Sequence, residues 1–160
     1  MKYEMLVLDL DGTLTNSRKE ITPATKQALI EIQEAGKKVV LASGRPTCGV
    51  VPLAKELELD RFGSYILSFN GALIIDCATN KPVYNKTLPR EVIAPIFECT
   101  KNYPGLDIIS YENDCVISGI KVNEYTKKEM FINKMPVKEV DNFVEYLDFP
   151  VNKMLIPGEP

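Results

Sequence analysis

The chain has 160 residues, of which 45% are hydrophobic and 26% are charged, a balance that suits a globular core and excludes a disordered chain. Its net charge of −3 argues against nucleic acid or an anionic membrane surface as a partner. No apolar stretch approaches the ~20 residues of a membrane-spanning helix, and no secretory signal precedes Asp9, so the expected location is the cytoplasm.

The chain contains no histidine, which excludes Ser–His and Cys–His nucleophile pairs and histidine metal sites. Its cysteines are widely spaced, so neither a zinc-binding CxxC pair nor a disulfide framework is expected. They are Cys48, Cys77, Cys99 and Cys115. Any proton transfer near neutral pH must therefore come from carboxylates, Lys, Tyr, Cys or water.

Strands and helices alternate in the first half of the predicted structure. Buried strands are predicted at residues 5–8, 39–42 and 65–69, with a further strand at 72–75 after a tight turn. A helix is expected from Thr22 and Pro23, a cap and a first helical position, to Gly36. A second helix is expected from about residue 46 to 57, with a kink at Pro52. This order predicts an α/β fold with a doubly wound, Rossmann-like parallel sheet.

The pattern changes after about residue 83. A helix is expected to begin at Pro89, and a second to run through residues 140–147. Strands are predicted at 106–111, 115–120 and 151–156. We expect residues 1–83 to form an α/β core and residues 84–160 an inserted α+β cap, with both parts incomplete at the C-terminus.

Three polar positions directly follow predicted parallel strands: Asp9, Ser43 and Asn70. Right-handed crossovers bring the carboxyl ends of such strands to one edge of the sheet, where open α/β sheets bind ligands. Asp9 and Asp11 are one residue apart, so their like charges repel unless a cation lies between them. Mg²⁺ prefers carboxylate and backbone oxygens, and Gly12 permits the sharp turn that such a loop needs. The alternative is a hairpin turn with solvated acidic side chains.

These residues resemble the motifs of a known family. The string Asp9-Leu10-Asp11-Gly12-Thr13 resembles the first motif of the haloacid dehalogenase superfamily, and Ser43-Gly44-Arg45 resembles the second. Asn70-Gly71-Ala72, followed by an α+β insert, is similar to the Cof-type (class IIB) branch, whose cap lies between the second and third motifs. The resemblance covers the whole chain.

The resemblance implies magnesium-dependent hydrolysis of a small phosphorylated metabolite, such as a sugar phosphate. Asp9 would be the nucleophile that forms an aspartyl-phosphate, and Asp11 the general acid and then the base. Mg²⁺ would bind the Asp9 side chain and the Asp11 backbone carbonyl. The residues implied to hold the substrate are Ser43, the backbone amides near Leu10 and Gly44, and Arg45, Asn70 and Gly71.

Several of these roles have alternatives. Thr13 either supports the loop or contacts substrate. Arg45 binds either the substrate anion, which we favour, or a neighbouring carboxylate. Asn70 and Gly71 either contact the ligand or only make the turn.

The family's third motif, with a lysine, and its fourth, with Gly-Asp, would follow the cap, whereas this chain ends at Pro160. Lys153 lies inside the cap segment, so we do not assign it as the third-motif lysine. The resemblance implies that the strand before Asp9 is central, and without a later strand beside it that strand would be an exposed apolar edge. The alternatives are an inactive phosphate- or metal-binding remnant, a fragment that needs a C-terminal partner chain or self-association, and a phosphoryl-transferring mutase.

Overall fold

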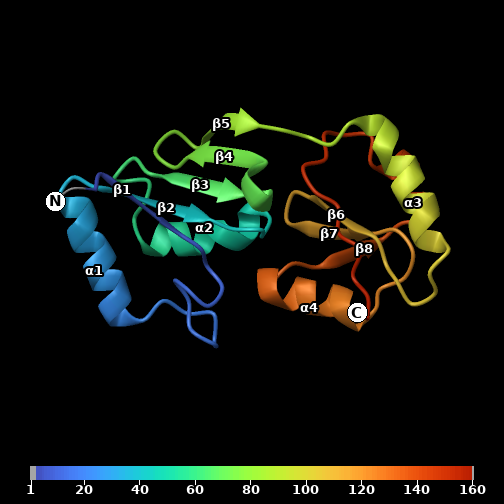
Figure 1. Ribbon diagram of the computed structural model, residues 1–160, viewed down its shortest axis with the longest axis horizontal. Coiled ribbons are helices and arrows are strands. Elements are labelled where there is room, and N and C mark those ends of the chain that lie inside the picture. Colours follow the sequence, from blue (N-terminus) through green and yellow to red (C-terminus); the bar gives the residue numbers. More distant parts are fainter. Residues whose placement is uncertain (1–2, 160) are drawn as a thin grey trace. The chain divides into compact units, whose positions relative to one another are not determined.

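The computed structural model describes residues 3–159, which form two compact units that divide after Asn85 (Figure 1). Each unit has its own sheet and its own cluster of buried hydrophobic side chains. Within residues 3–159, no helix is long and apolar enough to cross a membrane.

The first unit is built on a five-stranded sheet of order β1-β2-β3-β4-β5. Its strands are β1 (Met5–Leu8), β2 (Lys38–Ala42), β3 (Tyr65–Ser68), β4 (Leu73–Asp76) and β5 (Lys81–Asn85). The first three are parallel, and β4 and β5 extend the sheet as antiparallel strands. The α/β class is thus confirmed. Strand β5 was missed because all its residues are exposed and Pro82 interrupts its pattern.

The helices α1 (Pro23–Glu34) and α2 (Thr47–Glu56) connect these parallel strands and lie on one face of the sheet (Figure 1). Thr22 caps α1 by accepting a hydrogen bond from the Thr25 amide at 3.2 Å, as expected for its position. Pro52 lies inside α2 without ending it. Because the chain advances from β1 to β2 to β3 in one direction, two right-handed crossovers place both helices on the same side.

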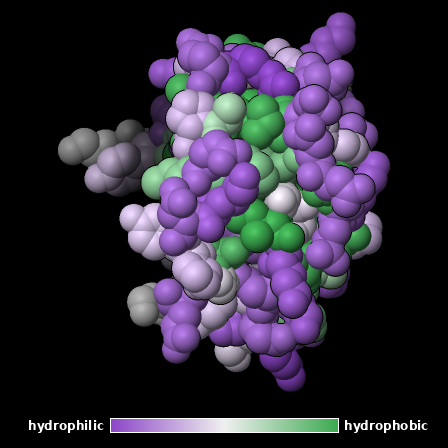
Figure 2. All heavy atoms as spheres, turned by 90° about the vertical axis from the view of Figure 1, so that its right-hand side faces the viewer, coloured by the Kyte–Doolittle hydropathy of each residue, from purple (hydrophilic) through white to green (hydrophobic). Residues whose placement is uncertain are grey.

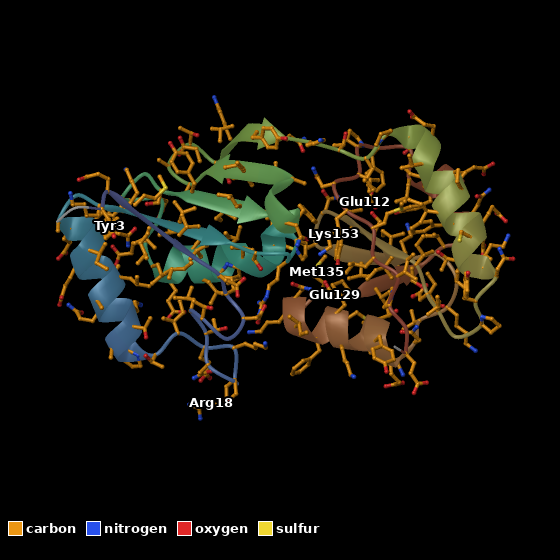
Figure 3. All side chains as sticks on the ribbon, in the orientation of Figure 1. Tyr3, Arg18, Glu112, Glu129, Met135 and Lys153 are labelled. Atoms are coloured by element: carbon orange, nitrogen blue, oxygen red, sulfur yellow. The ribbon has the colours of Figure 1, made fainter. Side chains whose placement is uncertain are left out.

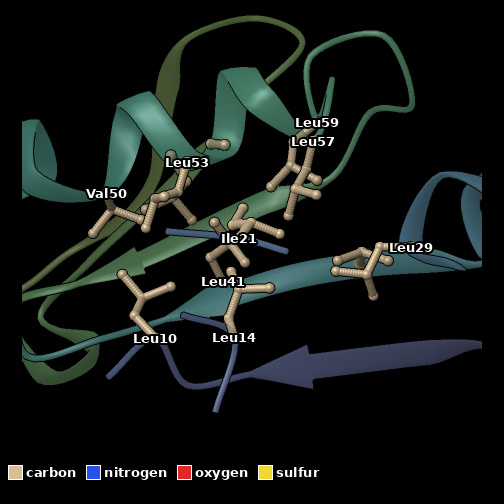
Figure 4. Close-up of a cluster of buried hydrophobic side chains, with 12 residues drawn as sticks. Leu10, Leu14, Ile21, Leu29, Leu41, Val50, Leu53, Leu57 and Leu59 are labelled. Carbon is tan, nitrogen blue, oxygen red and sulfur yellow. The ribbon is translucent and has the colours of Figure 1, made fainter. Parts of the chain in front are cut away.

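The core of the first unit fills the space between the sheet and these helices (Figure 4). Its buried members are Leu10, Leu14, Ile21, Leu29, Val39, Leu41, Val50, Leu53, Ala54, Leu57, Leu59 and Ile66. Burial of a large aliphatic side chain stabilises a fold by about 1.5–3 kcal/mol. Leu10 and Leu14 belong to the loop after β1, so core packing positions that loop.

The second unit has a three-stranded sheet of order β6-β7-β8. Its strands are β6 (Ile109–Glu112), β7 (Cys115–Ser118) and β8 (Val137–Glu139), and its helices are α3 (Ile93–Lys101), α4 (Glu124–Asn133) and α5 (Phe143–Tyr146), with a 3₁₀ turn, η2 (Arg90–Val92), before α3. Its core consists of Ile93, Ile108, Ile117, Phe143, Leu147 and Val151. Figure 2 shows hydrophobic side chains between hydrophilic margins on one face of this unit.

The expected strand at residues 151–156 is wrong. The segment runs beside β6, but it forms a single bridge, in which the amides of Ile109 and Leu155 each donate to the other's carbonyl at 2.8 and 2.9 Å. The next contact along the segment comes from a side chain, because Ser110 Oγ donates to the Lys153 carbonyl at 3.2 Å. Because a strand needs a continuous ladder of such pairs, residues 151–156 do not form one.

The second unit also contains elements that the sequence pattern did not predict. Helix α4 has no apolar stripe, and its buried residues are Thr126 and Asn133. Its start is set by Asn123, whose Oδ1 accepts from the amides of residues 125 and 126 at 3.0 and 2.8 Å. The helix expected through residues 140–147 is reduced to α5, a single turn.

A buried carboxylate organises the second unit. Asp107 has no exposed surface, and its carboxylate accepts hydrogen bonds from Ser118 Oγ and Thr126 Oγ1, each at 2.8 Å. It also accepts from the backbone amides of Ile108, Ile120 and Lys121. A buried charge is tolerated when its lone pairs are satisfied in this way. Asp107 thereby ties the start of β6 to the end of β7 and the start of α4.

We expect Asp107→Ala to destabilise the second unit by about 3 kcal/mol or more, because it leaves several buried donors without an acceptor. Urea unfolding followed by circular dichroism measures the change in the free energy of unfolding. Asp114→Ala, at an exposed turn between β6 and β7, is the matched control and should change it by less than about 0.5 kcal/mol. Equal effects of the two substitutions would show that the Asp107 network contributes little.

Candidate active site

The loop after β1 directs two carboxylates outward. Leu10 is fully buried in the core (Figure 4), whereas its neighbours Asp9 and Asp11 are exposed. The Leu10 carbonyl accepts hydrogen bonds from the amide and the hydroxyl of Thr15, both at 2.9 Å. Gly12 adopts the left-handed region with a φ of 82°, which favours glycine. The loop is therefore closed on itself, with its apolar side chain inside and its acidic side chains outside.

The loop after β2 is joined to the 3₁₀ turn η1 (Phe69–Gly71), which follows β3. The Asn70 amide donates to the Ser43 carbonyl at 3.1 Å, and the Phe69 amide donates to the Arg45 carbonyl at 2.9 Å. A Cβ atom at Gly44 would lie 3.2 Å from Asn70 Nδ2, so this close approach favours glycine. Phe69 and Asn70 thus shape the Ser43 loop, and contact of Asn70 and Gly71 with a ligand stays a prediction.

Arg45 connects the two loops through Asp11. Its Nε and Nη2 donate to the two carboxylate oxygens of Asp11 at 2.9 and 2.5 Å. Lys19 Nζ lies 2.7 Å from the same carboxylate. Arg45 has thus adopted the second of its two expected roles, binding a neighbouring carboxylate. The Arg45 hydrogen bonds hold the pKa of Asp11 below 3.8, against the opposing effect of burial, and Lys19 adds to the lowering.

Asp9 differs from Asp11 in having no such partner. No hydrogen bond or ion pair joins its carboxylate to the rest of residues 3–159, so it can accept a metal ion or attack a substrate. The same residues contain no group of three acidic, cysteine or histidine side chains that could hold a metal ion. Binding of Mg²⁺ by the Asp9 carboxylate and the Asp11 backbone carbonyl stays a prediction.

Ser43 and Thr13 complete the set of predicted residues. Ser43 is buried, and its Oγ accepts a hydrogen bond from the Arg45 amide at 3.2 Å. Thr13 is exposed, and its two alternative roles stay open. Two further residues of the site, Thr15, which closes the first loop, and Lys19, were not predicted from the sequence. Only the Asn16 turn signal near Lys19 could have drawn attention to its loop.

Comparison with known proteins places these loops in a family. The family model described as haloacid dehalogenase-like hydrolase matches residues 6–160. A solved haloacid dehalogenase-like hydrolase from Bacteroides thetaiotaomicron is 45% identical, with a TM-score of 0.91 over 99% of this chain and 59% of that chain. A protein named Putative phosphatase YxeH, from Bacillus subtilis, is 27% identical over 99% of this chain and 58% of its own length.

A third relative is the solved subclass IIB sugar phosphatase BT4131, at 23% identity and a TM-score of 0.75 over 96% of this chain and 58% of that chain. At this level of identity, the similarity shows a shared fold alone. The chain spans about three fifths of the length of these relatives. Because the family model matches residues 6–160, including the loops that carry Asp9, Asp11 and Ser43, the chain belongs to the haloacid dehalogenase-like hydrolase family.

Proposed function

We propose that residues 1–160 carry the nucleophile and proton-transfer half of a magnesium-dependent phosphatase that acts on a small phosphorylated metabolite through an aspartyl-phosphate. The observation that carries this proposal is the contrast between two carboxylates on one loop. Asp9 is exposed and has no hydrogen-bond or ion-pair partner among residues 3–159, whereas Asp11 is held by Arg45 and Lys19. The name of YxeH supports a phosphatase, and the description of BT4131 supports a sugar phosphate as substrate.

In the proposed reaction, the Asp9 carboxylate attacks phosphorus and the bond from phosphorus to the substrate alcohol breaks. Asp11 gives its proton to the leaving oxygen, then takes one from the water that releases phosphate from Asp9. Because its ion pairs keep Asp11 ionised, Asp11 first takes up from solvent, as Arg45 and Lys19 loosen, the proton that it gives to the leaving oxygen. Ser43 and the amides of Leu10 and Gly44 bind the phosphoryl oxygens.

The remaining assignments follow the same proposal. Mg²⁺ would be held by the Asp9 carboxylate and the Asp11 backbone carbonyl, where it would neutralise charge on the phosphoryl group. Asn70 and Gly71 would support the phosphate-binding loop. We assign the unit up to Asn85 as the α/β core and residues 86–160 as part of a cap, a boundary two residues later than expected because β5 pairs with β4.

In a protein that also contains the C-terminal half of the site, we expect Asp9→Asn to reduce phosphatase activity by more than about 10⁴-fold, beyond the loss typical of an acid–base group, while the fold persists. Asparagine keeps the shape of the side chain but loses the nucleophile and one metal-binding charge. Hydrolysis of p-nitrophenyl phosphate with magnesium measures the loss. Asp60→Asn, an exposed carboxylate of the same unit, should keep full activity. Activity of the Asp9 variant within tenfold of the parent would exclude Asp9 as the nucleophile.

Asp11→Asn should slow sugar phosphates more than p-nitrophenyl phosphate. A sugar alkoxide needs a proton as it leaves, whereas nitrophenolate needs little help, so the difference should reach about 10²-fold. The ratio of kcat/KM values on the two substrates reports this effect apart from any general damage to the loop. Equal losses on both substrates would assign Asp11 a structural role through Arg45.

We also propose that residues 1–160 associate, with a second copy or with a C-terminal chain, through the edge strand β1. Met5 and Val7 are 52% and 53% exposed at that edge, where unpaired backbone groups invite another strand. Val7→Lys should shift the purified chain toward monomer in size-exclusion chromatography with light scattering. Val83→Lys, on the opposite edge strand that contains Pro82, should leave association unchanged. A monomeric parent chain would refute this proposal.

A further inference from the structure

The loop of residues 16–20 holds Lys19 in a defined position. The Asn16 amide donates to the Glu20 carbonyl at 3.0 Å, and the Lys19 amide donates to the Asn16 carbonyl at 2.9 Å. Asn16 Oδ1 accepts from the amides of Arg18 and Glu20 at 2.8 and 3.1 Å. These four hydrogen bonds close the loop and determine where its side chains point.

Two neighbouring cations of this loop point in different directions. Arg18 projects from the loop into solvent, with 79% of its side chain exposed, and pairs with Glu20 (Figure 3). Lys19 instead reaches Asp11, at 2.7 Å. It does so with a φ of 63°, a left-handed conformation that is unfavourable for lysine. Such strain persists only where the surroundings impose it, and it is often found at functional sites.

Asp11 pairs with two cations at once. Arg45 and Lys19 share its single carboxylate, so either cation can be released without leaving Asp11 unpaired. Arg45 is anchored, because its side chain is 9% exposed and Nη1 also donates to the Gly49 carbonyl at 3.5 Å. The Lys19 side chain is 39% exposed, and among residues 3–159 Asp11 is its single ion-pair partner. Lys19 is therefore the cation that can turn toward a second anion.

We propose that Lys19 is a specificity-determining residue that binds an anionic group on the substrate's leaving alcohol. The preferred substrates are then phosphate monoesters whose alcohol carries a carboxylate or a second phosphate. This inference rests on the proposed function, in which Asp11 faces the leaving oxygen. A group within hydrogen-bonding distance of Asp11 lies beside that oxygen, and a lysine ammonium on a flexible stem suits either anion.

Matched substrates test the proposal. The first pair is 3-phosphoglycerate and glycerol 3-phosphate, which differ in one carboxylate, and the second is fructose 1,6-bisphosphate and fructose 1-phosphate. We expect kcat/KM to be about tenfold or more higher for the anionic member of at least one pair, the value of one charge-assisted hydrogen bond. The pair that shows the preference identifies the anion as carboxylate or phosphate.

Variants of the loop assign the preference to Lys19. Lys19→Gln should lower kcat/KM for the anionic substrate about tenfold more than for its neutral partner, mainly through KM, and Lys19→Arg should restore part of the preference. Arg18→Gln removes a neighbouring charge and should leave both values unchanged. Lys19→Gly should also lose the preference while keeping or raising Tm, because it relieves the left-handed strain.

The outcomes separate this proposal from the proposed function. Absence of magnesium-dependent hydrolysis of any ester, p-nitrophenyl phosphate included, by a protein that also contains the C-terminal half of the site would refute the proposed function. Hydrolysis without a preference for anionic substrates, or equal losses on both members of a pair in Lys19→Gln, would refute only the role of Lys19. Where turnover is slow, the rise in Tm on adding each substrate can be compared between the anionic and the neutral member of a pair. A lower Tm in Lys19→Gly with equal losses on both substrates would make Lys19 structural.

Discussion

The ion pair between Asp11 and Arg45 connects two loops that would otherwise be independent. One follows β1 and the other follows β2, and the guanidinium spans both oxygens of the carboxylate. A two-point contact of this kind restrains orientation as well as distance. Through the Arg45 carbonyl, which accepts from the Phe69 amide, the restraint continues to the turn after β3. The ends of three parallel strands are thereby assembled into one surface.

That ion pair depends in turn on a hydrophobic anchor. Leu10 lies between the two acidic residues in sequence and is fully buried in the core of the first unit. Because Leu10 packs in the core while Asp9 and Asp11 are exposed, burial of Leu10 fixes the loop that carries both carboxylates. Core packing of Leu10 therefore places the two carboxylates, and the ion pair with Arg45 then orients Asp11.

The two units stabilise a carboxylate in different ways. Asp107 is buried and surrounded by hydroxyl and amide donors, which satisfy it without a counter-charge. Asp11 is partly exposed and surrounded by two cations. Neutral donors on neighbouring strands and helices suit a permanent structural role, whereas flexible cations can be redirected by an incoming anion. The local environment thus distinguishes Asp107, which stabilises the fold, from Asp11, whose environment is compatible with proton transfer.

The sequence by itself determined the α/β class, the family and the positions of Asp9, Ser43 and Asn70 after successive strands, because apolar runs and motif spacing are local features. It did not reveal β5, whose residues are all exposed, or α4, which lacks an apolar stripe. Only the tertiary structure decided that Arg45 meets a carboxylate 34 residues away, and that Lys19 rather than Arg18 turns inward. Such partners depend on how the strands pair and how a loop closes, and no local pattern encodes either.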